Sequence, residues 1–155
     1  EGQEIVDYMP MEMCQTMNHS WGYSVADQDY KSVGTLVRLL AQCVSMNSNL
    51  LLNIGPQPNG ELPAAALERL KDIGVWMREN GESIYGTTRG EEYPWGVTTR
   101  KGDTLYLHVL EKTDNITLPL DKKPKGVSVP MDYDKRDKKL TIPNVKQFDI
   151  VKVLL

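Results

Sequence analysis

The stretch "SNLLLNIGPQPNG", Ser48–Gly60, decides the fold predicted for this protein. Its apolar run, Leu50–Ile54, is too short for a helix, and Gly55-Pro56 and Asn59-Gly60 are turn signals that close it. A short apolar run of this kind is typical of a central strand in a parallel sheet, buried on both faces. We therefore expect a buried parallel strand that is followed by a loop.

Helical patterns flank this strand on both sides. Over Lys31–Met46 apolar residues recur at the spacing of one helical face, and the Ser32 hydroxyl is suited to cap the first turn. A second helix is expected from Pro63 to Asn80-Gly81. Its predicted buried stripe consists of Leu67, Leu70, Ile73 and Met77. With Ile5–Thr16 as a preceding strand and its outgoing loop, this order of elements is typical of a βα-repeat fold.

After about Gly86 the pattern changes to short alternating segments. Lys101-Gly102-Asp103 is a turn signal between two strands, and four further strand-like segments follow: "NITLPL", "KGVSVPM", "KLTIPN" and "FDIVKVLL". The lysine-rich runs Asp121–Lys125 and Tyr133–Lys139 are expected to be solvated turns. The fold class is therefore α/β followed by all-β, with residues 1–86 as part of an α/β repeat and 87–155 as an antiparallel β-sandwich of some six strands.

Composition excludes several classes of protein. The chain has 155 residues, 40% hydrophobic and 25% charged, which is typical of a globular protein. The net charge of −3 gives no general attraction to nucleic acid or to an anionic membrane, and no apolar run approaches the roughly 20 residues of a membrane span. The N-terminal residues show no signal peptide. Cys14 and Cys43 are expected to be small buried thiols.

The segment "PMEMCQTMNHSWGY" carries the candidate chemistry. In a βα barrel the functional loops leave the C-terminal ends of the strands, and Glu12 is expected at or near such an end. Partial desolvation among Met11, Met13 and Trp21 would keep its carboxyl protonated near neutral pH, the state that a general acid requires. Trp21 and Tyr23 offer flat faces that can stack against a sugar ring.

Plainer interpretations of the same residues stay open at this point. Glu12 can be a solvent-facing or structural residue, and Trp21 and Tyr23 can be packing residues. His19 and His108 have no partner in the sequence that suggests a metal site or a nucleophilic triad. Asn49 and Asn53 flank the predicted buried strand, and both are expected to hydrogen-bond adjacent loops.

Three motifs, "MEMCQTMNHSWGYS", "NLLLNIGPQPNGELP" and "LERLKDIGVWMRENGESIYGT", resemble in order and spacing the last part of the catalytic barrel of α-L-fucosidases, glycoside hydrolase family 29. The resemblance covers about Asp7 to Thr87, and the β tail resembles that family's C-terminal sandwich. It implies the last units of a (β/α)8 TIM-type barrel, of which a complete copy takes about 250 residues.

The resemblance implies a retaining hydrolase that releases terminal α-linked L-fucose from glycans. Glu12 falls on the general acid/base of a Trp-Glu-x-Cys motif, although Met11 replaces the tryptophan, and Trp21 falls on an aromatic residue near the fucose pocket. The nucleophile aspartate of such enzymes lies upstream, so the missing N-terminal barrel portion would be a partner and this chain alone would be inactive. No cofactor or metal is implied, because this hydrolysis needs only two carboxyls. The family points to secretion, periplasm or lysosome.

Two alternatives concern the β tail. In one it is a carbohydrate-binding module with Tyr93, Trp95 and Tyr106 as a stacking surface. In the other it is purely structural and supports the barrel helices.

Overall fold

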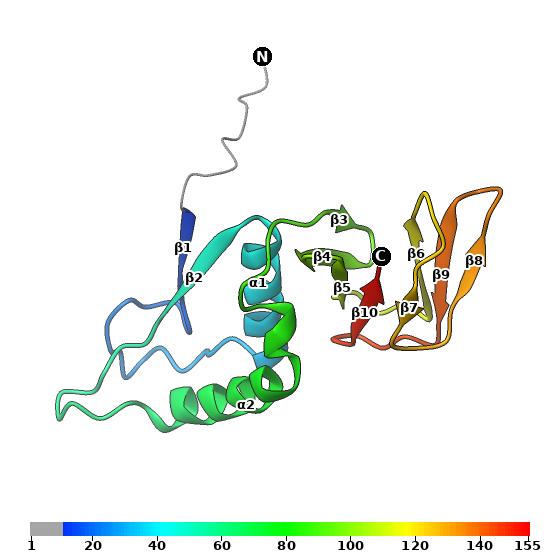
Figure 1. The fold of residues 1–155 in the computed structure, drawn as a ribbon. Coiled ribbons are helices and arrows are strands. Elements are labelled where there is room, and N and C mark those ends of the chain that lie inside the picture. The colour runs from blue at the N-terminus through cyan, green and yellow to red at the C-terminus, as the bar shows by residue number, and fades with distance from the viewer. Residues whose placement is uncertain (1–10) are drawn as a thin grey trace, which may run out of the picture. The chain divides into compact units, whose positions relative to one another are not determined.

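The computed structural model describes residues 11–155, and the chain divides after Arg78 into two compact units (Figure 1). Residues 5–10 of the predicted first strand lie outside the described residues. The elements of the first unit are β1 (Met11–Thr16), α1 (Val33–Ser45), β2 (Ser48–Asn53) and α2 (Ala64–Asn80). β1 and β2 pair in parallel with Met11 opposite Ser48 and Thr16 opposite Asn53. The predicted parallel strand is therefore confirmed.

Helix α1 forms where its apolar spacing predicts it. The Ser32 side chain accepts a hydrogen bond of 3.1 Å from the Thr35 backbone N–H, so the predicted N-cap is confirmed. The helix lies beside β2 (Figure 1) and buries Leu36 in a small core with Met17 and Ala66. This core fixes α1 against one face of the strand pair.

Replacement of Ser32 by alanine should lower the free energy of unfolding of the first unit by about 1 kcal/mol, because the Thr35 amide loses its partner. The measurement is urea unfolding followed by the helical circular dichroism signal. Ser24→Ala, in the loop before the helix, is the matched control and should unfold at the wild-type midpoint. Equal urea midpoints for Ser32→Ala and Ser24→Ala would contradict the stabilisation of α1 by the Ser32 cap.

Helix α2 buries a different face from the one predicted. Leu67 and Leu70 are 41% and 36% exposed, so their placement in the buried stripe was wrong. Ala66 is fully buried and Ile73 packs against the same core, while Arg69 takes the intervening position. Arg69 is held there by hydrogen bonds to backbone carbonyls, contacts that apolar periodicity does not detect.

The strand β2 is buried on one face only, contrary to the prediction. Leu51 is 48% exposed and Cys14, opposite it in β1, is exposed as well. Among the described residues the sheet has two strands, with helices against one of its faces. Cys43 is buried as predicted, whereas the prediction of a buried Cys14 was wrong, because its side chain lies on the uncovered face; both thiols are free.

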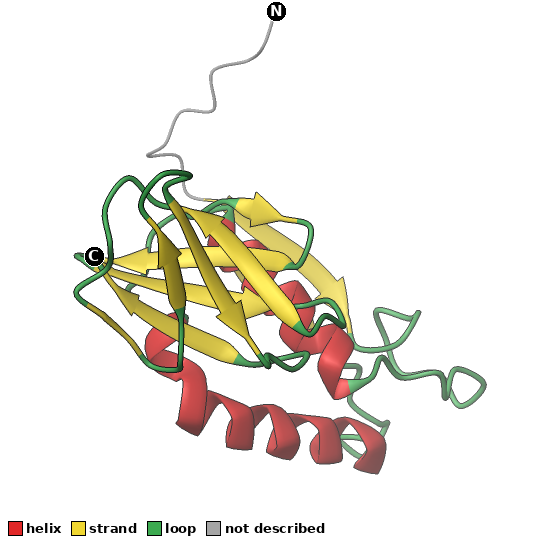
Figure 2. Cartoon of the chain, turned by 90° about the vertical axis from the view of Figure 1, so that its right-hand side faces the viewer, coloured by secondary structure: helices red, strands yellow, loops and turns green. Residues whose placement is uncertain are grey.

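The second unit is built from strands (Figure 2) after the 3-10 turn η1 (Gly81–Ser83). One sheet has the order β3-β4-β5-β10-β7 and the other the order β6-β9-β8. The strands are β3 (Glu92–Tyr93), β4 (Gly96–Lys101), β5 (Thr104–Val109), β6 (Asn115–Pro119), β7 (Gly126–Val127), β8 (Asp132–Asp134), β9 (Lys139–Pro143) and β10 (Ile150–Leu154). All pairings within these two sheets are antiparallel, as predicted.

The two sheets of this unit share one hydrophobic core, to which Leu107 and Val153 of one sheet and Leu118 and Leu140 of the other contribute. The predicted turn between β4 and β5 is confirmed, with Gly102 at a left-handed φ of 57°. The short strands β3 and β8 were not predicted, because two or three residues carry no readable alternation.

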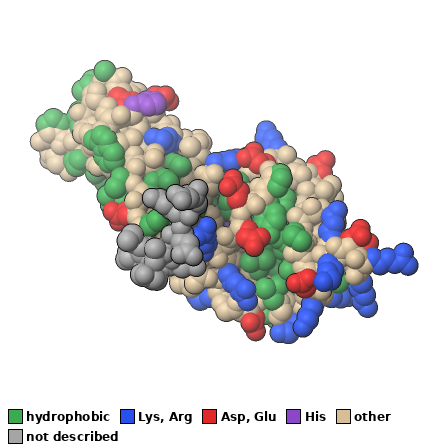
Figure 3. All heavy atoms as spheres, turned by 90° about the horizontal axis from the view of Figure 1, so that it is seen from above, with side chains coloured by type: hydrophobic (Ala, Val, Ile, Leu, Met, Phe, Trp, Pro, Cys, Tyr) green, Lys and Arg blue, Asp and Glu red, His purple; other side chains and the backbone are tan. Residues whose placement is uncertain are grey.

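The lysine-rich runs lie at the surface of the second unit. Lys122 and Lys138 are exposed, and Lys138 pairs with Asp121 at 3.0 Å. The second run was only partly a turn, since its first two residues belong to β8. On the face seen in Figure 3, basic and acidic side chains (blue and red) are interspersed. Neither helix described here is both long and apolar enough to cross a membrane.

Candidate functional site

The two faces of the β1–β2 pair have different surroundings. Side chains alternate along a strand, and on one face the Cys43 thiol of α1 lies 3.6 Å from the Met13 sulfur of β1. The opposite face, which we call the open face, carries the exposed side chains of Glu12, Cys14 and Leu51. The open face therefore presents a carboxylate beside a partly apolar surface.

Glu12 is the second residue of β1 and not part of the loop that follows, so its expected place near the strand end was wrong. The ladder with β2 continues to Thr16, about 13 Å further along the strand. Glu12 is exposed, and its expected neighbours Met11 and Trp21 are 43% and 59% exposed. The described residues therefore do not supply the desolvated environment expected for this carboxyl.

The β1–α1 loop, residues 17–32, begins at the C-terminal end of β1 and carries the candidate aromatic residues. Trp21 is 59% exposed, Tyr23 37% and Val25 74%. An exposed indole has a flat apolar face that can stack on the apolar face of a sugar. The predicted stacking residues are therefore available at the end of the sheet where parallel folds place their functional loops.

The end of β2 holds this loop. The Asn53 side-chain amide donates a hydrogen bond of 2.6 Å to the Trp21 carbonyl, which confirms the prediction that Asn53 bonds an adjacent loop. Gly55 lies so close to the backbone of Gly22 and Tyr23 that a side chain would not fit between them. In the sequence Gly55 is only a turn signal, because this close approach joins residues more than 30 positions apart.

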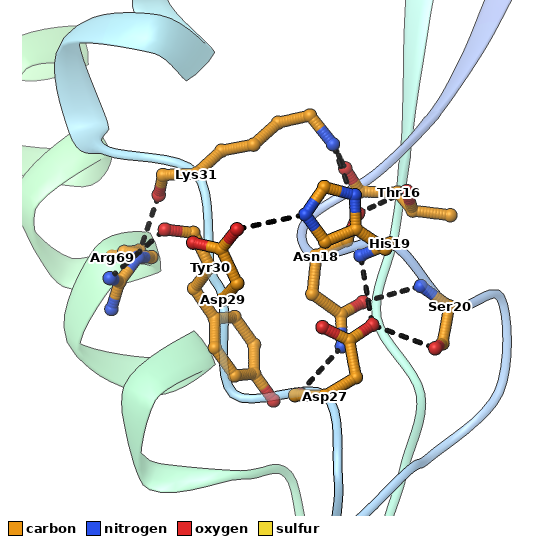
Figure 4. A network of polar contacts seen from close by, with 9 residues as sticks. All are labelled: Thr16, Asn18, His19, Ser20, Asp27, Asp29, Tyr30, Lys31 and Arg69. Atoms are coloured by element: carbon orange, nitrogen blue, oxygen red, sulfur yellow. Dashed lines mark hydrogen bonds and ion pairs between the residues drawn. The ribbon is translucent and has the colours of Figure 1, made fainter.

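Lys31 anchors the far end of the β1–α1 loop, as Figure 4 shows. Its ammonium donates hydrogen bonds of 2.6 and 3.0 Å to the carbonyls of Thr16 and Asn18. Its backbone N–H donates to the Met17 carbonyl at 2.8 Å. The two ends of the loop are thereby joined at the C-terminal end of β1.

Asp27 organises the middle of the loop (Figure 4). Its carboxylate accepts hydrogen bonds from the Ser20 hydroxyl at 2.7 Å and the His19 N–H at 3.0 Å. These bonds, that of Ser20 foremost, lower the pKa of Asp27 below its ordinary value. His19 also has a partner that the sequence did not reveal, because its Nε2 lies 2.9 Å from an Asp29 carboxylate oxygen.

Helix α2 contacts the last residues of the β1–α1 loop through Arg69. The Arg69 guanidinium donates a hydrogen bond of 2.7 Å to the Lys31 carbonyl and lies over the Tyr30 ring, 5.3 Å from its centre. Figure 4 shows Arg69 reaching from α2 to the last residues of the loop. The loop is thus fixed to β1, β2 and α2.

The aromatic residues predicted to form a stacking surface on the β tail do not form a surface exposed to solvent. Trp95 and Tyr106 are 6% and 3% exposed, and Tyr93 stacks on Trp95 with ring centres 4.9 Å apart. The Trp95 N–H donates to the Thr117 carbonyl at 2.9 Å. Trp95 and Tyr106 are therefore buried and Tyr93 is half-buried, so the carbohydrate-binding alternative loses the exposed aromatic surface on which it depended.

Within residues 11–155, no group of three or more His, Cys, Asp or Glu side chains is arranged to hold a metal ion. The site-forming residues that sequence analysis missed are Lys31, Asp27 and Gly55. The apolar pattern placed Lys31 at the start of the helix, which begins at Val33 in the structure. Asp27 lies in a loop whose sequence gives no periodic signal. For Gly55 the only signal was its place directly after the apolar strand.

The sequence of this chain is similar to those of known proteins of one family. The family model described as Alpha-L-fucosidase matches residues 2–82, just over half of the chain. An alpha-L-fucosidase of Branchiostoma floridae is 34% identical over 77% of this chain and 29% of its own length. One of Dictyostelium discoideum is 31% identical over 89% of this chain and 35% of its own length.

A solved structure is similar as well. Alpha-L-fucosidase isoenzyme 1 from Paenibacillus thiaminolyticus is 35% identical, with a TM-score of 0.85, over 95% of this chain and 40% of that one. The chain therefore spans well under half the length of the proteins that it matches. The family model, together with these relatives, shows that the chain belongs to the alpha-L-fucosidase family.

Proposed function

We propose that this chain is the C-terminal part of a retaining α-L-fucosidase that releases terminal α-linked L-fucose from glycans. The observation that carries the proposal is the open face of a parallel strand pair in a chain of this family. That face bears the exposed carboxyl of Glu12, and the loop from the same strand presents the exposed indole of Trp21. Carboxyl and aromatic groups of these kinds are what glycoside hydrolysis uses.

In the proposed mechanism Glu12 is the general acid/base. Its carboxyl donates a proton to the leaving glycosidic oxygen while an aspartate nucleophile, supplied from upstream of this chain, attacks the anomeric carbon. The resulting Glu12 carboxylate then removes a proton from the water that hydrolyses the covalent intermediate. Retention requires the two carboxyls to stand about 5–5.5 Å apart.

Trp21 is the proposed substrate-binding residue, and it stacks on the apolar face of the fucose ring. The exposure of its indole and the fixed backbone of its loop support this role. The substrate is a fucosylated glycan or fucoside, and no cofactor takes part.

We further propose the domain architecture that the family implies. Residues 1–86 would be the last units of a (β/α)8 barrel. In that barrel the open face would line the interior, and strands from the upstream portion would complete the sheet. Residues 87–155 would be a β-sandwich that acts as scaffold. The shared core of the two sheets supports the sandwich, and the helix-covered face of the strand pair supports the partial barrel.

The test is hydrolysis of 4-nitrophenyl α-L-fucoside. The chain alone should release no nitrophenol, because the nucleophile aspartate is not part of it, and the addition of the upstream barrel portion should give turnover. The first sugar released, followed by NMR, should be the α-anomer. Turnover by the chain alone would contradict the upstream nucleophile, and a complete protein without turnover on any α-L-fucoside would contradict the fucosidase function.

A further inference from the structure

The segment at the end of β2 touches the β1–α1 loop at successive points. The Asn53 carbonyl accepts a hydrogen bond of 3.1 Å from the Met17 N–H, which extends the parallel ladder by one residue. The Asn53 side-chain amide then donates to the Trp21 carbonyl at 2.6 Å. One residue of β2 therefore fixes both the start of the loop and the backbone of Trp21.

Gly55 adds a steric contact directly beside these bonds. A Cβ atom at this position would lie 2.4 Å from both the Gly22 carbonyl carbon and the Tyr23 nitrogen. Both are backbone atoms, which cannot move aside as the end of a flexible side chain can. The backbone on the C-terminal side of Trp21 therefore rests against a position that only glycine can occupy without displacing the loop.

The Trp21 side chain has no comparable support of its own. Its 59% exposure means that most of the residue faces solvent, so its place is determined chiefly by where its backbone is held. The rest of the loop is fixed behind it by Lys31 and Asp27 (Figure 4). A side chain contributes its full share of binding free energy only when the residues around it hold it in the geometry that the ligand requires.

We propose that Asn53 and Gly55 are positioning residues that set the location of the Trp21 indole at the C-terminal end of the strand pair. The ligand class is a sugar with an apolar ring face, of which L-fucose is the probe, and this part rests on the proposed function. Asn53 acts through the Trp21 carbonyl and Gly55 through the close approach of the backbone. Neither side chain contacts the sugar.

The test uses the full chain labelled with ¹⁵N. Asn53→Asp is nearly isosteric but cannot donate to the Trp21 carbonyl, and Gly55→Ala adds the obstructing methyl group. The backbone order parameters of Trp21 and Gly22 should fall from about 0.85 to below about 0.6 in both variants. Asn49→Asp is the matched control, because Asn49 lies on the same face of β2, and it should leave these values unchanged. Unchanged amide signals from α1 and from residues 64–78 of α2 verify that the first unit of each variant is folded.

The second readout is the indole N–H signal of Trp21, identified among the three tryptophans by its loss in Trp21→Phe. On titration with L-fucose, Asn53→Asp should weaken binding by roughly two- to tenfold, the loss expected for one hydrogen bond. If the Trp21 backbone stays rigid in both variants, or loosens equally in Asn49→Asp, the positioning proposal is overturned. If the backbone loosens as expected, positioning stands. The sugar contact of the proposed function fails if the indole signal of wild-type Trp21 responds to L-fucose neither in the chain alone nor after addition of the upstream barrel portion.

Discussion

In the complete enzyme, Glu12→Gln should lower the turnover of α-L-fucosides with poor leaving groups by about 10²–10⁴-fold. The glutamine amide keeps the shape of the side chain but has no acidic proton to give to the departing oxygen. With 4-nitrophenol, which leaves without such help, the loss should be smaller. The measurement is kcat across a series of aryl fucosides of rising leaving-group pKa, where the variant should show a steeper dependence than the wild type.

The matched control is Glu68→Gln, an exposed carboxyl of α2 to which no role is assigned, and its turnover should equal that of the wild type. Small anions such as azide need no general base, so they should accelerate the second step in Glu12→Gln and not in the control. Wild-type turnover of Glu12→Gln would exclude Glu12 as the proton donor.

The second unit should lose about 3 kcal/mol of unfolding free energy between pH 6.5 and pH 4, because of His108. The Thr99 hydroxyl donates to the Ser83 carbonyl at 2.7 Å, so His108 Nε2, 2.9 Å away, donates to Thr99. His108 Nδ1 has no hydrogen-bond partner among the described residues, and the side chain is fully buried. A proton added at Nδ1 would therefore be a buried and unpaired charge.

The direction of this change in unfolding free energy with pH follows from the two pKa values of the His108 imidazole, one in the folded chain and one in the unfolded chain. Burial lowers the pKa of His108 from 6.5 to about 4 in the folded chain, whereas the unfolded chain keeps the ordinary value. Between these values the unfolded state binds the proton and the folded state does not, so stability falls as the pH falls through this window. Below about pH 4 both states are protonated and the loss is complete.

Urea unfolding of the chain at steps between pH 7 and pH 4 measures this effect. His108→Gln keeps a donor for Thr99 but does not titrate, so the difference in pH dependence between wild type and variant isolates the histidine. The comparison is needed because Glu82 has its pKa lowered by Lys152 and also loses stabilisation in acid. His19→Gln, a change at an exposed histidine, should keep the wild-type slope; the same slope in His108→Gln would contradict the prediction.

Some parts of the fold were predictable because their signals are local. The cap at Ser32, the hairpin at Gly102 and the strand before Gly55 each depend on a few adjacent residues. The motifs around Glu12 and Trp21 also indicated the family, which the comparisons confirm. For these features the amino-acid sequence by itself was sufficient.

Other features required contacts between residues far apart in the chain. The position of Glu12 along its strand was decided by the ladder with β2, and the burial of Trp95 by the packing of two sheets. The support of Trp21 by Asn53 joins residues 32 positions apart. Local periodicity records which side chains are apolar, but not which neighbour covers them or which distant carbonyl they reach. The sequence by itself therefore determined the elements, the motifs and the family, whereas only the tertiary structure decided which side chains are open to a ligand and what holds them there.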